Sequence, residues 1–220
     1  MVTRPIGHSA CGASVVVTAF VLLALVVFAG AAHAQGGTQI QAPLGLIWGW
    51  HEKDLIRNGV TITSRRPLKV GGGQLLRVTN TPGTIKDTSL ISLVVTTRYG
   101  LQKVIWSSAT FKNDKFGSRG KARYNEMKSS LARRYGTPKF YEYSGRKVRK
   151  KADEFYLCLR VTGCGNWASY WTTNYIGSIL LEIKGFTTGN GYILMAYEGP
   201  HFSPFMRQQK ARPNAAGDAL

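Results

Sequence analysis

The sequence predicts an α+β domain with a mostly antiparallel β-sheet and two helices. Two segments carry the start and stop signals of helices, and several short runs rich in β-branched and aromatic residues are typical of strands. The strands follow each helix in groups instead of alternating with helices one by one, which favours this class over a parallel α/β sheet. With five Trp, ten Tyr and nine Phe in 220 residues, the chain has the aromatic content of a globular protein.

The first 34 residues have the three parts of a secretory signal peptide. Arg4 precedes an apolar run over 14–29, and the Ala-His-Ala at 32–34 is a small-x-small cleavage pattern. The run is about 16 residues long, shorter than a membrane-spanning helix requires; an uncleaved anchor is the alternative. We expect cleavage after Ala34, a periplasmic or secreted product comprising residues 35–220, and no transmembrane span in that product.

Cleavage also changes the cysteine count. Cys11 is lost with the signal peptide, so Cys158 and Cys164 remain. In an oxidising compartment an isolated pair predicts a disulfide. The alternative is a redox-active pair, but such pairs normally have Cys-x-x-Cys spacing at the start of a helix, and this pair is expected beside a strand.

We expect the mature chain to comprise a flexible leader over 35–43, a single domain over 44–199 and a disordered tail over 200–220. The leader and the tail are short and rich in small or polar residues. Near the start of the domain, residues 51–59 predict a short helix, with acids in its first turn and Gly59 as its stop.

The first group of strands follows this helix. Residues 68–80 predict an extended segment that the glycines at 71–73 interrupt. Residues 90–98 and 101–109 predict a hairpin that turns at Tyr99-Gly100.

The second helix is predicted over 118–136, after a polar connector over 110–120. Ser118 is the expected N-terminal capping residue, Gly136 is a typical C-cap, and Pro138 prevents continuation. One apolar stripe has the spacing of a helix face, and its members are Tyr124, Met127, Leu131 and Tyr135.

The remainder of the domain predicts strands. Apolar residues alternate over 155–161, which predicts a strand with Cys158 on its opposite face. Further strands are predicted over 167–173, 176–184 and 192–197, with the last turn between Gly185 and Gly191.

Two motifs carry a resemblance to a group of known proteins. Gly45-Leu-Ile-Trp-Gly49 opens the domain, and Leu131-Ala-Arg-Arg-Tyr-Gly-Thr-Pro138 ends the second helix. Together with the late strands up to residue 198, they resemble uncharacterised bacterial exported α+β domains that have a G-L-x-W-G start and an L-x-x-R-Y-G-x-P helix end. The resemblance implies an exported α+β domain and no catalytic residues. The glycines at 71–73 and the basic residues at 146–151 are not part of this pattern.

The sequence lacks the usual signatures of catalysis. The mature chain has two histidines, His51 and His201, which we expect to be ordinary surface residues, and no metal-ligand motif, so no metal or cofactor is expected. Asp153 and Glu154 are adjacent on the expected strand and would point to opposite faces, which prevents them from acting as a pair. Residues 163–168 match a dinucleotide fingerprint formally but lack the strand and helix that must flank it.

Charge is the strongest functional signal in the sequence. The whole chain has a formal net charge of +18, and removal of the signal peptide takes away Arg4 alone, which leaves +17. Clustered cations beside aromatic rings suit a polyanion, because cations pair with phosphates or sulfates and flat rings stack. The expected anion-binding residues are Arg146, Lys147, Arg149, Lys150 and Lys151, with Arg119, Lys121 and Arg123 as support.

The first basic group lies next to Lys139 and the aromatic residues Phe140, Tyr141 and Tyr143. A turn at Ser144-Gly145 would present it at a hairpin tip. Outside the cytoplasm, anionic lipid, lipopolysaccharide phosphates and acidic proteins are more available than nucleic acid, which we do not expect as a partner. The alternative is that the basic run only solubilises the protein.

The sequence therefore predicts an exported, non-enzymatic binding or accessory domain with a basic surface for anionic envelope components or an acidic partner. One alternative is a small-molecule or glycan-binding domain that uses a Trp-rich sheet face, although such rings are often core residues. Its candidate residues are Trp48, Trp50, Trp167 and Trp171. The other alternative is an envelope hydrolase with dispersed carboxylates.

Overall fold

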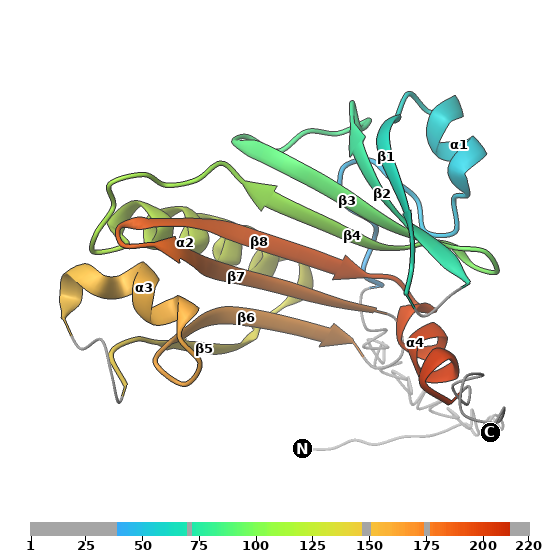
Figure 1. The fold of residues 1–220 in the computed structure, drawn as a ribbon. Helices are drawn as coiled ribbons and strands as arrows, with labels where there is room; N and C mark the ends of the chain where they lie inside the picture. The colour runs from blue at the N-terminus through green and yellow to red at the C-terminus, as the bar shows by residue number, and fades with distance from the viewer. Residues whose placement is uncertain (1–38, 70–71, 147–150, 174–176, 212–220) are drawn as a thin grey trace, which may run out of the picture. The chain divides into compact units, whose positions relative to one another are not determined.

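The computed structural model describes residues 39–69, 72–146, 151–173 and 177–211. The expected signal peptide and the first part of the leader lie outside these residues. Eight strands form one antiparallel sheet in the order β1-β2-β3-β4-β8-β7-β6-β5 (Figure 1). The strands are β1 (Thr61–Pro67), β2 (Gly73–Thr79), β3 (Thr88–Thr96), β4 (Gly100–Ser108), β5 (Lys139–Tyr143), β6 (Asn166–Thr173), β7 (Gly177–Thr187) and β8 (Asn190–Glu198).

The helices complete the predicted α+β class, which is confirmed. Four α-helices occur in the described part of the chain, where the sequence predicted two. They are α1 (Glu52–Arg57), α2 (Ser118–Tyr135), α3 (Phe155–Arg160) and α4 (Phe202–Ala211), with a short 3₁₀ helix, η1 (Ala152–Glu154), before α3. None of the described helices is long and apolar enough to cross a membrane.

The chain builds the sheet in two successive halves. Strands β1 to β4 pair in sequence order, and so do β5 to β8, while α1 precedes the first group and α2 the second. The last strand of each half joins the two, since β4 pairs with β8 from Lys103 opposite Glu198 to Ser107 opposite Leu194. This arrangement leaves β1 and β5 as the two edges of the sheet.

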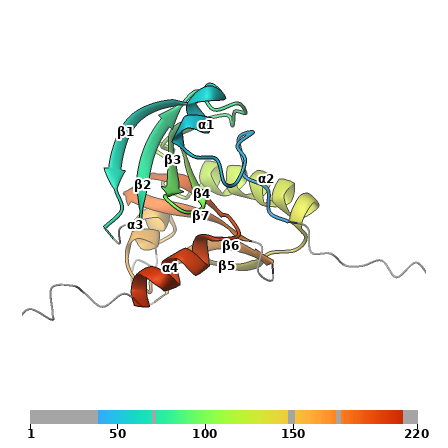
Figure 2. The same ribbon diagram turned by 90° about the vertical axis from the view of Figure 1, so that its right-hand side faces the viewer.

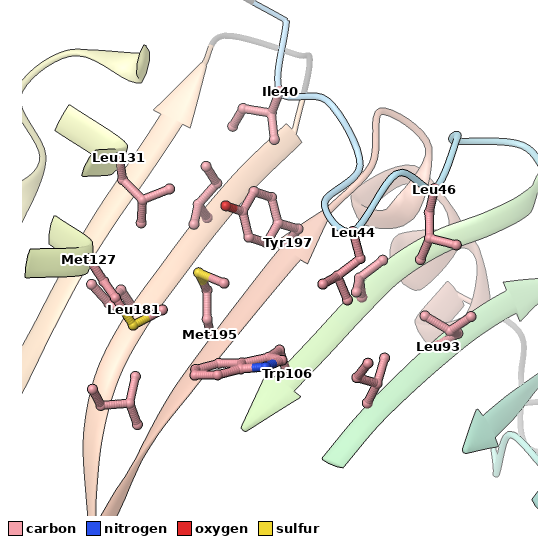
Figure 3. Packing of buried hydrophobic residues seen from close by; sticks show 14 of the residues in the cluster. Ile40, Leu44, Leu46, Leu93, Trp106, Met127, Leu131, Leu181, Met195 and Tyr197 are labelled. Atoms are coloured by element: carbon pink, nitrogen blue, oxygen red, sulfur yellow. The ribbon is translucent and has the colours of Figure 1, made fainter. Parts of the chain in front are cut away.

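The core lies between the sheet and α2. Met127 and Leu131 point from α2 towards Leu181, Met195 and Tyr197 on β7 and β8 (Figure 3). The segment before α1 extends this core and contributes Ile40, Leu44 and Leu46. The helical stripe predicted from the sequence is therefore confirmed, with Tyr124 fully buried as well.

The start of α2 is capped differently from the prediction. Gly117 is the N-cap residue, with a φ of 71°, and Ser118 is the first helical residue. The side chain of Asp114 takes the capping role, because its Oδ2 accepts hydrogen bonds from the backbone N–H groups of Arg119 and Gly120, both at 3.1 Å. A carboxylate at this position also interacts favourably with the helix dipole.

The strand predicted over residues 155–161 is wrong, because residues 155–160 form α3. A period of two over so few residues does not distinguish a strand from one turn and a half of helix. Phe155, Tyr156 and Cys158 are the buried residues of this segment, which is the face of a helix and not of a strand.

Two glycines of the β7–β8 hairpin make room for α3. A Cβ atom on Gly185 would lie 1.7 Å from the carbonyl oxygen of Tyr156, and one on Gly191 would lie 2.0 Å from its ring. The helix therefore packs directly on the backbone of the hairpin. Glycine at both positions permits a close approach that any side chain would prevent, and this tertiary contact overrides the local alternation.

The predicted disulfide between Cys158 and Cys164 is confirmed. Its setting differs from the prediction, since Cys158 lies within α3 and not on a strand. Asp153 and Glu154, expected on the same strand, lie in η1. Both cysteines are buried, so the disulfide is part of the packed structure.

The two edge strands and the last helix were not predicted from the sequence. Strand β1 has six exposed residues and one partly buried residue, Ile62, and β5 has none that is fully buried. Such exposure removes the alternating apolar pattern on which strand prediction relies.

Residues 202–211 form α4, where a disordered tail was expected, and Phe205, which is 3% exposed, anchors this helix. Helices α4 and α2 lie at different sides of the strands (Figure 2).

Candidate anion-binding surface on strand β5

The structure describes five of the eight expected anion-binding residues. Arg146 follows β5, Lys151 precedes η1, and the other three lie in the first two turns of α2. Lys147, Arg149 and Lys150 lie outside the described residues.

Strand β5 positions cations and aromatic rings on one face. Lys139, Tyr141 and Tyr143 alternate along the strand and are paired with Tyr170, Ala168 and Asn166 of β6, so their side chains share one face of the sheet. Phe140 and Glu142 point to the other face, which α2 covers. The sequence signal for this arrangement is the spacing of two along residues 139–143, from which no strand was predicted.

Each of the two tyrosines is paired with a cation. The Arg146 guanidinium lies 3.7 Å from the centroid of the Tyr143 ring, and the Lys139 ammonium lies 5.6 Å from that of Tyr141. Tyr170, from the neighbouring strand, contacts Tyr141 edge to face at 6.1 Å. We call Lys139, Tyr141, Tyr143 and Arg146 the β5 surface.

The disulfide loop holds the beginning of the basic run in place. The backbone N–H of Arg146 donates to the carbonyl oxygen of Cys164 at 2.9 Å, and that of Gly145 approaches Cys158 Sγ at 3.1 Å. Gly145 has a φ of 78°, a conformation that favours glycine. The first cation of the basic run, Arg146, is therefore fixed beside the disulfide, while residues 147–150, predicted to lie at a hairpin tip, are outside the described residues.

The opposite face of β5 is electrically balanced. Glu142 accepts a hydrogen bond from the Lys128 ammonium at 2.5 Å, and the same ammonium lies 3.8 Å from the centroid of the Phe140 ring. The one acidic side chain of β5 is therefore neutralised on the α2 side. The β5 surface keeps the positive charges of Lys139 and Arg146.

The three supporting cations of α2 have partners within the protein. The Arg119 guanidinium donates to the carbonyl oxygen of Lys112. Arg123 forms an ion pair with Glu126 at 2.7 Å and lies 3.9 Å from Asp87. Their partners lie outside the β5 surface, and of the five described candidate residues only Arg146 belongs to that surface.

Lys121 has a third kind of environment. Its ammonium lies 4.1 Å from the ring centroid of Phe155 and 4.9 Å from that of Trp167, and it donates to the carbonyl oxygen of Phe116 at 3.1 Å. Desolvation lowers the pKa of Lys121, while the negative charge of Asp114 acts in the opposite direction.

The N-terminus of α2 is occupied by the protein's own carboxylate. Oδ2 of Asp114 accepts the Tyr156 hydroxyl at 2.8 Å in addition to the two backbone N–H groups. Burial raises the pKa of Asp114, but the hydrogen bonds from Gly120, Tyr156 and Arg119 together outweigh this effect and hold the pKa below its ordinary value. An external anion therefore has no access to these donors.

The tryptophans and the two histidines make contacts within the fold. Trp106 and Trp171 are buried, and Trp48, Trp50 and Trp167 are partly buried against the core. His51 precedes α1 and forms a capping box with Asp54, and the ring of His201 stacks on that of Tyr99 at 4.7 Å.

The β5 surface combines positive charge with aromatic rings. In the described part of the chain, the only buried acid is Asp114, and no three His, Cys, Asp or Glu residues are grouped as a metal site requires. The β5 surface offers two cations held over rings, each interaction contributing about 0.5–1 kcal/mol.

No family model, curated protein or solved structure matches this chain.

Proposed function

We propose that this protein is an exported binding protein without catalytic activity, whose β5 surface and basic run bind an anionic component of the cell envelope or an acidic partner. The observation that carries the proposal is the alignment of Lys139, Tyr141, Tyr143 and Arg146 on one face of an edge strand. In the sequence, Lys147, Arg149, Lys150 and Lys151 follow Arg146 directly.

Export is supported by two independent features. The N-terminal sequence has the organisation of a signal peptide, and the disulfide between Cys158 and Cys164 is typical of proteins that fold outside the reducing cytoplasm. The periplasm or the extracellular space is therefore the compartment that we propose. In both, anionic lipid, lipopolysaccharide phosphates and acidic polypeptides are the abundant polyanions.

Two features favour anion binding over the alternatives. The tryptophans that would line a glycan groove are packed in or against the core. The carboxylate that a hydrolase could use, Asp114, is committed to hydrogen bonds with Tyr156 and the start of α2. The positive charge of the β5 surface, by contrast, is directed to solvent.

The proposal is tested by removing the basic run. We replace Arg146, Lys147, Arg149, Lys150 and Lys151 by Ser and measure binding to two anionic probes, phosphatidylglycerol vesicles and polyglutamate, with phosphatidylcholine vesicles as the neutral reference. Each cation near an anionic surface contributes about 1 kcal/mol, so the five substitutions should weaken binding at least a hundredfold. Binding should also weaken from 50 to 500 mM salt, because salt screens charge interactions.

A matched control separates local from total charge. In this control variant, Ser replaces five exposed cations that are distant in sequence from β5, namely Lys53, Arg66, Lys69, Arg77 and Lys86. The variant should retain most of the affinity. Equal losses in the two variants would contradict a specific surface and leave only non-specific attraction. If the wild-type protein binds neither anionic probe at 50 mM salt, the proposal is wrong.

A further inference from the structure

The two edges of the sheet differ in how they are protected. A strand edge with unpaired N–H and C=O groups is a template for another strand, and proteins usually block it. Strand β1 is blocked in this way: its register shifts between Ile62 and Ser64, it ends in Pro67, and Arg65 and Arg66 lie beside the proline. This edge is poorly suited to accept a partner.

Strand β5 lacks the register shift and the proline of β1, although it is short and carries Lys139. Its pairing with β6 runs without a register shift from Lys139 opposite Tyr170 to Tyr143 opposite Asn166, and no proline interrupts it. In the described part of the chain, β5 pairs with β6 alone. Figure 1 shows it at the end of the sheet, beyond β6. Its outer N–H and C=O groups are therefore available to a partner strand.

Apart from Glu142, the side chains along this edge are aromatic or basic. Phe140 is 52% exposed and Tyr141 is 42% exposed, so both faces of the strand offer a ring to a neighbour. Lys139 and Arg146 flank these rings. Because Lys128 neutralises Glu142, a strand placed beside β5 would meet net positive charge.

We infer that the edge of β5 binds an extended acidic peptide segment, which adds to the sheet as a ninth strand. This inference rests on the proposed function and names its partner: backbone hydrogen bonds to β5 supply affinity, and the cations select acidic side chains. A second copy of the chain is a poor occupant, because pairing would bring two basic edges together on molecules whose mature net charge is +17. A lipid surface supplies charge but no strand.

The test separates backbone pairing from charge. The probe is a ten-residue peptide that alternates Glu and Val, and its matched control has the same sequence with alternate backbone nitrogens methylated, which removes hydrogen-bond donors from one edge and keeps the charge. We measure affinity for the full mature protein by fluorescence anisotropy, and hydrogen exchange of residues 139–143 with and without the peptide. The unmodified peptide should bind at least tenfold more tightly and should slow exchange on β5.

Three outcomes would overturn the inference. If both peptides bind alike and exchange on β5 does not change, charge alone drives binding, and the proposed function survives without strand addition. If vesicles bind while neither peptide does, the partner is a lipid surface. If the protein alone dimerises at micromolar concentration with β5 protected from exchange, the partner is a second copy. Absence of binding to peptides and to vesicles would instead refute the proposed function.

Discussion

Substitution of Asp114 is the most direct test of the contacts that stabilise the second half of the fold. Asp114→Ala removes one oxygen that accepts three hydrogen bonds, from Arg119 N–H and Gly120 N–H at 3.1 Å and from the Tyr156 hydroxyl at 2.8 Å. Loss of the helix cap costs about 1–2 kcal/mol. Tyr156 is 0% exposed, and leaving its hydroxyl without an acceptor costs about 1–3 kcal/mol.

The expected loss in the free energy of unfolding is therefore about 2–5 kcal/mol. Urea unfolding followed by Trp fluorescence measures it, with Ser129→Ala, an exposed substitution on the same helix, as a control that should leave the midpoint unchanged. Asp114→Asn keeps an acceptor oxygen and loses only the charge, so its effect should be smaller. A loss below about 1 kcal/mol for Asp114→Ala would refute the capping role.

The same carboxylate predicts a pH dependence. Its pKa is lowered in the folded protein, so its stabilising effect is present above the unfolded-state pKa of about 4 and is lost as the pH falls through the lower folded-state pKa. The stability difference between wild type and Asp114→Asn should therefore be constant near neutral pH and decrease below about pH 4. A difference that grows in acid would contradict this sign.

Three further predictions follow from the same structure. Tyr156→Phe should lower the free energy of unfolding by about 1–2 kcal/mol. In a double-mutant cycle, the loss in the double variant with Asp114→Ala should be smaller than the sum of the two single losses, since both substitutions remove the same hydrogen bond. Full additivity would show that the contact is not formed. Replacing Cys158 and Cys164 by Ser should lower stability by about 2–2.5 kcal/mol and weaken anion binding, because the disulfide loop holds the start of the basic run; unchanged affinity would contradict that link. Mass spectrometry of the exported protein should find Gln35 at its N-terminus, and an intact N-terminus would refute cleavage.

The sequence predicted those parts of the fold whose signal is local. Helix α2 was predicted from its apolar stripe and from Gly136 at its end, and the hairpin of β3 and β4 from two β-rich runs around Gly100. Both elements bury one complete face, so the apolar pattern survives in the sequence. The disulfide was predicted because only two cysteines lie outside the expected signal peptide.

The errors arise where tertiary contacts decide. Residues 155–160 alternate like a strand but become helical because Gly185 and Gly191, distant in sequence, leave space for Tyr156. Strands β1 and β5 lack an apolar pattern because they lie at the edges of the sheet. The cap of α2 was assigned to Ser118, since the bend that brings Asp114 to the helix start cannot be read from a pattern.

The candidate site, too, could be predicted only where its signal is local. The basic run was visible as composition, but its neighbours on β5 were not recognised as one face because the strand itself was missed. Lys139, Tyr141 and Tyr143 acquire a common direction only through their pairing with β6. Of the supporting cations, Arg119 is held by the carbonyl oxygen of Lys112, and Arg123 by Glu126 and Asp87.

The most direct test of the β5 surface is a charge reversal at its two described cations. Lys139→Glu with Arg146→Glu is compared with Lys53→Glu with Arg66→Glu, which makes the same change in net charge away from β5, and affinity for polyglutamate is measured at 50 and 500 mM salt. We predict at least a tenfold loss for the first pair at low salt, little change for the second, and weaker binding of the wild type at high salt. Equal affinities for the two pairs, or wild-type binding that salt does not affect, would contradict the proposed surface.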